Sequence, residues 1–414
     1  MIADRRGSTL TSVMQGVRIL EVAEHTFVPA ASAVLAEWGA EVIKIEHVER
    51  GDAMRGLASS GVTVLGGNVH LLVEHSNRGK QSLGLDLTSE EGLDILYQLA
   101  ATCDVFLTNK LPSVRKKLKI DIDDIQAHNP QIIYVRGTGQ GELGPDADAG
   151  SYDALAFWCR SGIAMSLKQP EDAHVQLPPG PAFGDSIGAM TIAGGIMGAL
   201  FHRERTGEAT TVDVSLLGVG LWSMGAGLAL SLQNDAPWAP RPINASTGNP
   251  LVNNYETKDG RFIALSCLQA ARYWAEACAA LGLTDLVEDP RFADAALLTA
   301  NADAATELVA AAIRERTAAE WLERLEGFSG QWVLVQNTIE AAHDRQTVAN
   351  SYIQDYESAD GGSFRLVTPP VQYGGQPPAP KRAPTFNEHG DDILASLGLD
   401  WDTVVDLKVR GVVA

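Results

Sequence analysis

The sequence predicts an α/β protein whose main layer is a Rossmann-like parallel sheet flanked by helices. Three observations support this fold class: short apolar runs alternate with helical stretches over residues 17–135, a Pro- and Asn-rich stretch follows at 235–250, and a hairpin pattern comes next. At 414 residues the chain exceeds one ordinary core, which favours two domains. We therefore expect a large α/β domain and a smaller α+β domain.

Strands and helices alternate through the first region. Strands are predicted at 18–22, 42–45, 82–87, 104–107 and 132–135. A helix at 29–37 has Pro29 in its first turn, and a capping box at 88–91 opens a helix that runs to about residue 102. The turn at 23–29 contains no glycine, so the dinucleotide fingerprint is absent and NAD is not expected as a cofactor.

Apolar helices are predicted over 186–233. The charge-free stretch 214–234 is long enough to cross a membrane, but its glycines and serines make it weakly apolar, so a buried helix is predicted. A hairpin at 255–266 and Ala- and Leu-rich helices to about residue 325 follow, and residues 331–384 have a strand-and-turn composition. The predicted divisions are an extension at 1–15, a large domain at 16–233, a small domain with its linker at 234–330, and a last segment at 331–414.

Composition limits the classes of partner. Hydrophobic residues make up 45% and charged residues 20% of the chain, which is typical of a globular protein. A formal charge of -20 argues against nucleic acid and anionic membrane surfaces as partners. The four cysteines have no metal-ligand spacing and no secretory signal opens the chain, so a reducing cytoplasm and no bound metal are expected.

Asp185 stands at the mouth of the long apolar helix, in the stretch Gly184-Asp185-Ser186. Aspartate is a preferred N-cap residue, so a capping role is one interpretation. The alternative is a nucleophile, because helix amides and the helix dipole would keep a carboxylate ionised and could stabilise an oxyanion beside it. The residues alone leave both interpretations open.

Two further features indicate ligand binding. Residues 104–120 hold five basic side chains against the single acid Asp104, which suits phosphates or, alternatively, a solvated helix face. The loop that carries His25 and Thr26 follows the first strand, at the edge of the sheet where open α/β folds bind ligands, although a histidine there is often only a surface residue. The five basic residues are Lys110, Arg115, Lys116, Lys117 and Lys119.

From about Gly16 to Val412 the chain resembles the family III CoA-transferases of the CaiB/BaiF type. Nine motifs in a fixed order carry the resemblance: GVRILE at 16–21, GAEVIKIE at 39–46, RGDAMR at 50–55, NRGK at 77–80, DVFLTN at 104–109, NPQIIYV at 129–135, YD at 152–153, GDS at 184–186 and HRERTG at 202–207. The resemblance implies that Asp185 is the residue that becomes acylated. It also implies a discontinuous large domain with the small domain inserted, and a homodimer of two interlocked rings.

The resemblance further implies coenzyme A as part of the substrate. Backbone amides near His25 would cover the thioester, and Asn109 and Lys117 would contact the nucleotide, the latter at its 3′-phosphate. The full set assigned to coenzyme A binding is His25, Thr26, Phe27, Arg55, Lys80, Asn109, Lys110, Lys117, Leu118, Arg136, Thr138 and Tyr152.

The predicted reaction moves CoA from an acyl-CoA donor to a carboxylic acid through an aspartyl-acyl anhydride and an aspartyl-CoA thioester. In the racemases that resemble this chain a histidine stands at the position of Tyr152, and a phenol of ordinary pKa ~10 is a poor base at neutral pH. An acyl-CoA racemase or epimerase is therefore the second hypothesis. A CoA-binding homologue without catalytic activity is the third. Residues 249–254 lack the run of glycines that forms an active-site lid in some transferases.

Overall fold

The computed structural model describes residues 12–59, 64, 65, 67, 69–238 and 247–414. The described residues before 239 and from 349 onward form one compact unit, and those of 247–348 form a second. The first unit is therefore discontinuous in sequence, and it carries all of the predicted site residues.

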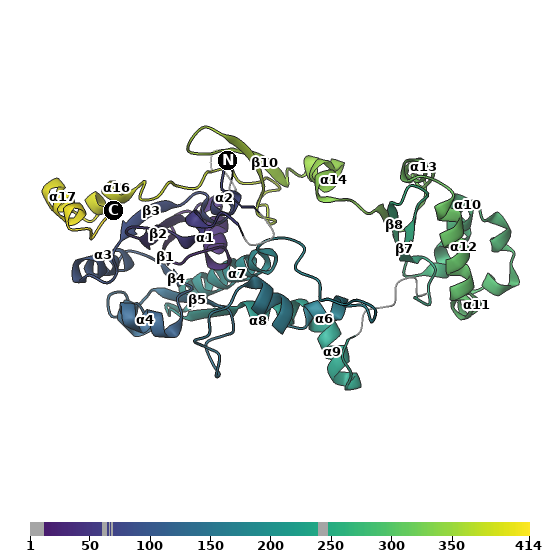
Figure 1. Cartoon of the computed structure of the whole chain (residues 1–414), viewed down its shortest axis with the longest axis horizontal. Helices are drawn as coiled ribbons and strands as arrows, with labels where there is room; N and C mark the ends of the chain where they lie inside the picture. Colours follow the sequence, from purple (N-terminus) through teal and green to yellow (C-terminus); the bar gives the residue numbers. More distant parts are fainter. Residues whose placement is uncertain (1–11, 60–63, 66, 68, 239–246) are drawn as a thin grey trace, which may run out of the picture. The chain divides into compact units, whose positions relative to one another are not determined.

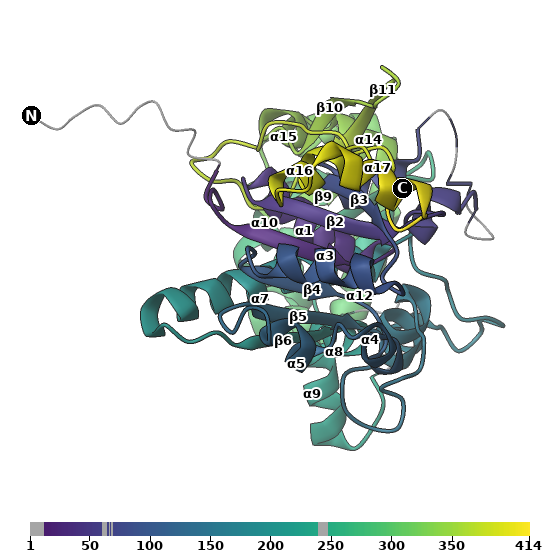
Figure 2. The ribbon, with the colours of Figure 1, turned by 90° about the vertical axis from the view of Figure 1, so that its left-hand side faces the viewer.

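A six-stranded parallel sheet forms the centre of the first unit (Figures 1 and 2). Its strands lie in the order β3-β2-β1-β4-β5-β6, and all five pairs are parallel. This is the strand order of a doubly wound nucleotide-binding fold, in which the order reverses between β1 and β4. The strands are β1 Arg18–Val22, β2 Glu41–His47, β3 Gln81–Leu85, β4 Val105–Thr108, β5 Ile133–Thr138 and β6 Thr211–Ser215. The prediction of a parallel α/β sheet is confirmed.

Helices cover both faces of this sheet, because alternate strand residues point to opposite sides. Ile19 of β1 joins a core with α1 Phe27–Glu37 and α7 Phe183–Thr206, whereas its neighbour Leu20 joins a core with α3 Glu90–Ala100. Every residue of α1 is buried. The shorter helices of this unit are η1 Ala53–Gly56, α2 Leu71–Asn77, α4 Pro112–Leu118, α5 Ile122–Gln126, the π-helix η2 Ala154–Arg160 and α6 Ile163–Leu167.

The cap of α3 differs from the predicted capping box. Ser89 is the N-cap, and its hydroxyl accepts a hydrogen bond from the amide of Gly92 at 3.0 Å. Thr88 instead donates its hydroxyl to Asp86 at 2.7 Å. The side chain of Asp86 thereby organises the turn between β3 and α3.

The prediction of one buried helix at 214–234 is wrong for the single chain. The segment begins in the edge strand β6 and continues as α8 Leu216–Ser223 and α9 Gly225–Asn234, which are bent by 73° relative to each other. Trp222 is 85% exposed and Leu232 is 76% exposed. An apolar composition indicates that a helix needs a partner surface, but it does not say where that surface lies. By length and hydropathy α7 also passes a membrane-span test, although its buried residues join the core beside the sheet.

The second unit contains an antiparallel sheet, β7-β8-β9, packed against helices. The predicted hairpin is confirmed as β7 Val252–Glu256 paired with β8 Phe262–Ser266. The third strand, β9 Trp332–Leu334, pairs with β8, so residues 331–348 group with this unit and the chain returns at 349 instead of 331. The helices are α10 Ala270–Leu281, η3 Thr284–Val287, η4 Pro290–Phe292, α11 Ala295–Ala300, α12 Ala302–Arg314, α13 Ala318–Arg324 and α14 Thr338–His343; α15 Arg345–Ala349 follows.

The returning segment completes the first unit. Its hairpin pairs β10 Ile353–Glu357 with β11 Ser363–Val367, and Tyr356 donates its hydroxyl to the buried Glu37 of α1 at 3.1 Å. Asn387 accepts a hydrogen bond from the amide of Gly84 in β3 at 3.0 Å. The last helices, α16 Gly390–Ser396 and α17 Trp401–Val409, add apolar side chains to the core on the α3 side.

Candidate active site

Asp185 is the third residue of α7, not its cap. The helix begins at Phe183 after Ala182, which has a left-handed backbone (φ 57°) and no polar side chain to cap the helix. Asp153 takes that role from a distance: both of its carboxylate oxygens lie 3.1 Å from the amide nitrogen of Gly184, which donates to them. The capping interpretation of Asp185 is therefore wrong, because the carboxylate of Asp153 caps the helix in its place.

Position 184 has no room for a side chain, because Asp153 and Phe157 pack against its backbone. A Cβ at position 184 would lie 2.5 Å from Oδ1 of Asp153 and 2.2 Å from the ring of Phe157. Both of these residues belong to the segment around the π-helix η2, and such helices are frequent at functional sites. Phe157 and Trp158 are buried, and both meet the half-exposed ring of Phe183 edge-on.

The pKa of Asp185 is raised to about 7, first because burial penalises the charged carboxylate and second because the negative charge of Asp153 lies nearby. The expectation that helix amides keep this group fully ionised is therefore wrong. Burial also raises the pKa of Asp153, while its hydrogen bonds from the amides of α7 oppose that rise. The Asp185 carboxylate is therefore poorly solvated when it is charged.

His75 is a neighbour of the site that the sequence did not indicate. It lies on α2, and its Nε2 is 3.5 Å from the hydroxyl of Ser186, which donates to the carbonyl of Ala182 at 2.9 Å. Burial and, to a lesser extent, the charge of Arg78 together lower the pKa of His75 to about 4. The imidazole is therefore neutral at physiological pH.

The loop after β1 is fixed at three consecutive backbone positions. Lys44 donates to the carbonyl of Ala23 at 2.7 Å. The side chain of Asn109 accepts from the amide of Glu24 at 3.2 Å and donates to its carbonyl at 2.7 Å. Asp52 accepts from the amide of His25 at 3.0 Å. These contacts hold His25 in a left-handed conformation (φ 69°), which only glycine adopts without strain.

A buried charge network supports this loop. Nζ of Lys44 lies 2.7 Å from Glu21 and 2.8 Å from Asp52, and all three side chains are inaccessible to solvent. Burial opposes the charge of Lys44, but Asp52 and Glu21 outweigh it and raise its pKa. Burial likewise opposes ionisation of Asp52, yet Lys44 and the amides of His25 and Met54 hold its pKa at about 2.

Lys80 belongs to the same network, which corrects its assignment to coenzyme A. Its Nζ donates to Glu21 at 2.7 Å and to the carbonyl of Pro29 at 2.8 Å, and its side chain is fully buried. Burial lowers its pKa to about 7, against the opposing effect of Glu21. The side chain thus supports the strands and α1 instead of reaching a ligand.

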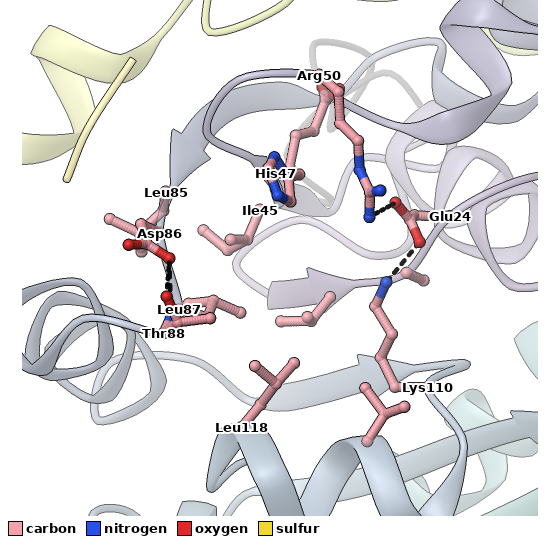
Figure 3. A pocket seen from close by; sticks show the side chains of 14 residues that line it. Glu24, Ile45, His47, Arg50, Leu85, Asp86, Leu87, Thr88, Lys110 and Leu118 are labelled. Carbon is pink, nitrogen blue, oxygen red and sulfur yellow. Dashed lines mark hydrogen bonds and ion pairs between the residues drawn. The ribbon is translucent and has the colours of Figure 1, made fainter. Parts of the chain in front are cut away.

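A cavity of about 200 Å³ opens at the carboxyl ends of β1, β2, β3 and β4, next to the point where the strand order reverses (Figure 3). Glu24 lies between two cations there: its carboxylate is 2.5 Å from Nζ of Lys110 and 3.9 Å from Arg50. The cavity is lined by Val22, Ala23, Glu24, Ile45, Glu46, His47, Arg50, Leu85, Asp86, Leu87, Thr88, Lys110, Val114 and Leu118.

The structure places part of the predicted binding set at this cavity. Lys110 and Leu118 line it, and Asn109 holds the loop beside it. Lys117 is exposed on α4 between the lining residues Val114 and Leu118, but it does not itself line the cavity. Of the predicted basic cluster, Arg115 is buried and paired with Glu142 and Asp121, so its role is structural.

The other predicted residues lie on β5 or in segments that follow β1, β2 and β5. Arg55 forms a two-point ion pair with Glu46, and Arg136 forms one with Asp213. Thr138 is buried at the end of β5, where its hydroxyl accepts from the amide of Gly141. Thr26 and Phe27 are buried at the start of α1, and the 64%-exposed Tyr152 meets the ring of His25 edge-on with 5.6 Å between ring centres.

Sequence reasoning missed several residues that line the cavity. His47 and Arg50 follow β2, and Asp86 and Thr88 follow β3. The signal that could have found them is positional, since the carboxyl ends of neighbouring parallel strands converge on one edge of the sheet.

Comparisons with known proteins agree with this architecture. The family model described as CoA-transferase family III matches residues 14–390. The chain is 28% identical to (R)-2-hydroxy-4-methylpentanoate CoA-transferase of Clostridioides difficile over 407 residues, covering 97% of this chain and 99% of the relative. It is 28% identical to cinnamoyl-CoA:phenyllactate CoA-transferase of Clostridium sporogenes, covering 96% of each.

Solved structures show the same similarity. A crystal structure of Rv3272 from Mycobacterium tuberculosis superposes with a TM-score of 0.79 at 27% identity, covering 93% of this chain and 99% of the other. A CAIB/BAIF family protein from Brucella suis superposes with a TM-score of 0.77 at 25% identity, covering 94% and 100%. Because the family model matches residues that include the whole parallel sheet, the Asp185 helix and the inserted unit, this chain belongs to CoA-transferase family III.

Proposed function

We propose that this protein transfers CoA from an acyl-CoA donor to a carboxylic acid acceptor, with the Asp185 carboxylate as the covalent carrier. The observation that carries the proposal is the placement of Asp185. It sits in the first turn of α7 with its carboxylate relieved of capping by Asp153. A poorly solvated carboxylate that needs no structural partner is suited to nucleophilic attack.

The proposed reaction proceeds in four balanced steps. A carboxylate oxygen of Asp185 attacks the thioester carbonyl carbon, the carbon–sulfur bond breaks, and CoA leaves as a thiolate from an aspartyl-acyl anhydride. The thiolate attacks the aspartyl carbonyl and expels the donor acid as its carboxylate. The acceptor carboxylate then attacks the aspartyl-CoA thioester and again releases the thiolate. Attack of that thiolate on the acceptor's acyl carbon gives the new acyl-CoA and restores Asp185.

Donors for the developing oxyanion are available at the start of α1. The N-cap residue of this helix, Thr26, makes no side-chain cap hydrogen bond, so the amides of the first turn beside the His25 loop are the candidate donors. The clamp on that loop by Lys44, Asn109 and Asp52 would preorganise these donors. We assign the nucleotide of CoA to the cavity shown in Figure 3, where Lys110 offers a positive charge to a phosphate.

One observation favours a second candidate, an acyl-CoA racemase. Tyr152 stands where such racemases have a histidine, but the ring of His25 lies against Tyr152. His25 would then be the base that a racemase needs in addition to Asp185. Incorporation of solvent deuterium at the α-carbon distinguishes the two reactions, because acyl transfer never breaks that carbon–hydrogen bond.

We also propose that the protein is a homodimer of interlocked subunits. The apolar side chains that α7, α8 and α9 expose in the single chain support this, among them Phe201, Trp222 and Leu232. A second copy of the chain would cover them. Sedimentation over a wide dilution range should show a dimer throughout, and a folded monomer would contradict the proposal.

The test of the transferase is a matrix of donors and acceptors taken from the names of the relatives. Succinyl-CoA and cinnamoyl-CoA would each be combined with 2-hydroxy acids and dicarboxylic acids, and new acyl-CoA would be measured by mass spectrometry. We expect transfer for at least one pair and its loss by several orders of magnitude in Asp185→Ala. Near-normal activity in that variant would exclude Asp185 as the carrier.

A further inference from the structure

Glu24 occupies the place in the cavity where an anionic ligand group would bind. One carboxylate oxygen lies 2.5 Å from Nζ of Lys110, and the other lies 3.9 Å from Arg50 (Figure 3). The remaining acids of the lining are Glu46, which is committed to Arg55, and Asp86, which accepts from Thr88. The two cations that face the cavity are therefore neutralised by a side chain of the protein itself.

The position of Glu24 is built into the fold. Asn109 holds both its amide and its carbonyl, and the neighbouring Ala23 and His25 are held by Lys44 and Asp52. The backbone at residue 24 thus cannot move far. Its side chain is less restricted, because Glu24 and Lys110 are 20% and 22% exposed and Arg50 is 66% exposed.

We propose that Glu24 is an exchangeable counter-ion, which a phosphate group of the ligand displaces from Lys110 and Arg50. This inference rests on the proposed binding of CoA in the cavity. Partly exposed ion pairs are weak, whereas a phosphate brings up to two charges and three acceptor oxygens. A ligand with several phosphate charges can therefore displace Glu24, and a singly charged carboxylate or chloride ion gains little by doing so. Glu24 would thus restrict this cavity to ligands that carry several negative charges.

The experiment measures CoA binding to the ligand-free protein by calorimetry in the wild type and in Glu24→Gln. Removing the competing carboxylate should tighten binding by up to about fivefold, the range expected when one exposed ion pair no longer has to be broken. Glu49→Gln is the matched control, because it removes the same charge from an exposed residue that is nearby in sequence and does not line the cavity. Its affinity should remain that of the wild type.

Two further arms identify the displacing group and test the mechanism. If Glu24→Gln also binds dephospho-CoA more tightly than the wild type does, the diphosphate displaces Glu24. If the increase in affinity disappears with dephospho-CoA, the 3′-phosphate displaces it. Adenosine, which has no phosphate, should show no gain. In a Lys110→Gln background the substitution of Glu24 should lose most of its effect, because the cation that it masks is gone.

The outcomes separate this inference from the proposed function. If the wild type binds CoA and Glu24→Gln binds it equally or more weakly, Glu24 supports the site and the exchange is refuted while the transferase proposal stands. If Glu49→Gln tightens binding as much as Glu24→Gln does, the effect is general electrostatics and the exchange is also refuted. A wild type that binds no CoA at all overturns both.

Discussion

Replacing Asp185 with asparagine should stabilise the protein while removing its catalytic activity. The pKa of Asp185 is about 7 in the folded protein against an ordinary value of 3.8. Between these values the unfolded chain has lost the proton and the folded chain still holds it, so the stability of the wild type falls as pH rises from about 4 to about 7. At ~1.36 kcal/mol per pKa unit the full cost above pH ~7 is at most about 4 kcal/mol.

Partial exposure of Asp185 reduces this figure, so we expect Asp185→Asn to be more stable by about 2–4 kcal/mol at pH ~8. For a chain of 414 residues this corresponds to a rise in melting temperature of about 2–5 °C. At pH ~5 only about a third of the gain should remain, because most of the titration lies above that pH. Thermal unfolding of the ligand-free protein, followed by circular dichroism, measures both values.

Asp303 provides the matched control, since it is an exposed aspartate in the first turn of α12. Asp303→Asn removes a favourable interaction with the helix dipole and should not raise the melting temperature. An Asp185→Asn protein that is less stable than the wild type at pH ~8, or whose gain is the same at both pH values, would refute the assigned burial and repulsion.

Three further predictions follow from the site. Asp153→Asn should shift the acid limb of the pH profile of kcat/KM to lower pH, because it removes the negative charge beside Asp185; an unchanged limb would mean that the two carboxylates do not interact. Lys117→Ala should weaken the binding of CoA more than the binding of dephospho-CoA, by the ~1.5–3 kcal/mol that a charge-assisted phosphate contact contributes. Equal weakening of both ligands would show that Lys117 does not contact the 3′-phosphate. In deuterium oxide the enzyme should not exchange the α-hydrogen of its acyl-CoA, and exchange that is abolished by Asp185→Ala would favour the racemase.

The sequence was sufficient to predict the parallel sheet, because buried parallel strands are runs of Val, Ile and Leu between turn residues. The five predicted strands are found with shifts of one or two residues at most of their ends. The sixth strand was missed, because Thr211–Ser215 lies at the edge of the sheet and has a mixed polar composition that merges with the apolar helix after it. Edge strands carry a weaker pattern than central strands.

The candidate site was predictable where a motif marked it and not where it depends on tertiary contacts. Asp185 was found through its motif, whereas the contact of Asp153 with Gly184 joins residues 31 positions apart. A lysine that binds phosphate and one that is buried against a carboxylate look alike in sequence. Lys80 proved to be the second kind because its partner, Glu21, lies 59 positions away.

The position of Glu24 between two cations belongs to the same class of missed feature. Lys110 is 86 positions from Glu24 in the chain, and only the folding of β1 and β4 side by side brings their carboxyl ends together. The positive charges at 104–120 lie close together in the sequence, whereas Glu24, which pairs with Lys110, lies outside that stretch. A count of charges within the stretch therefore gives too many cations that are available to a ligand.

The most direct test of the central claim is to trap the covalent carrier. The wild-type protein would be incubated with an acyl-CoA that it turns over, quenched with hydroxylamine, digested, and analysed by mass spectrometry. We expect a hydroxamate on the peptide that contains Asp185, formed only in the presence of the acyl-CoA. A modification on another residue, or an unmodified Asp185 under conditions of active transfer, would contradict it.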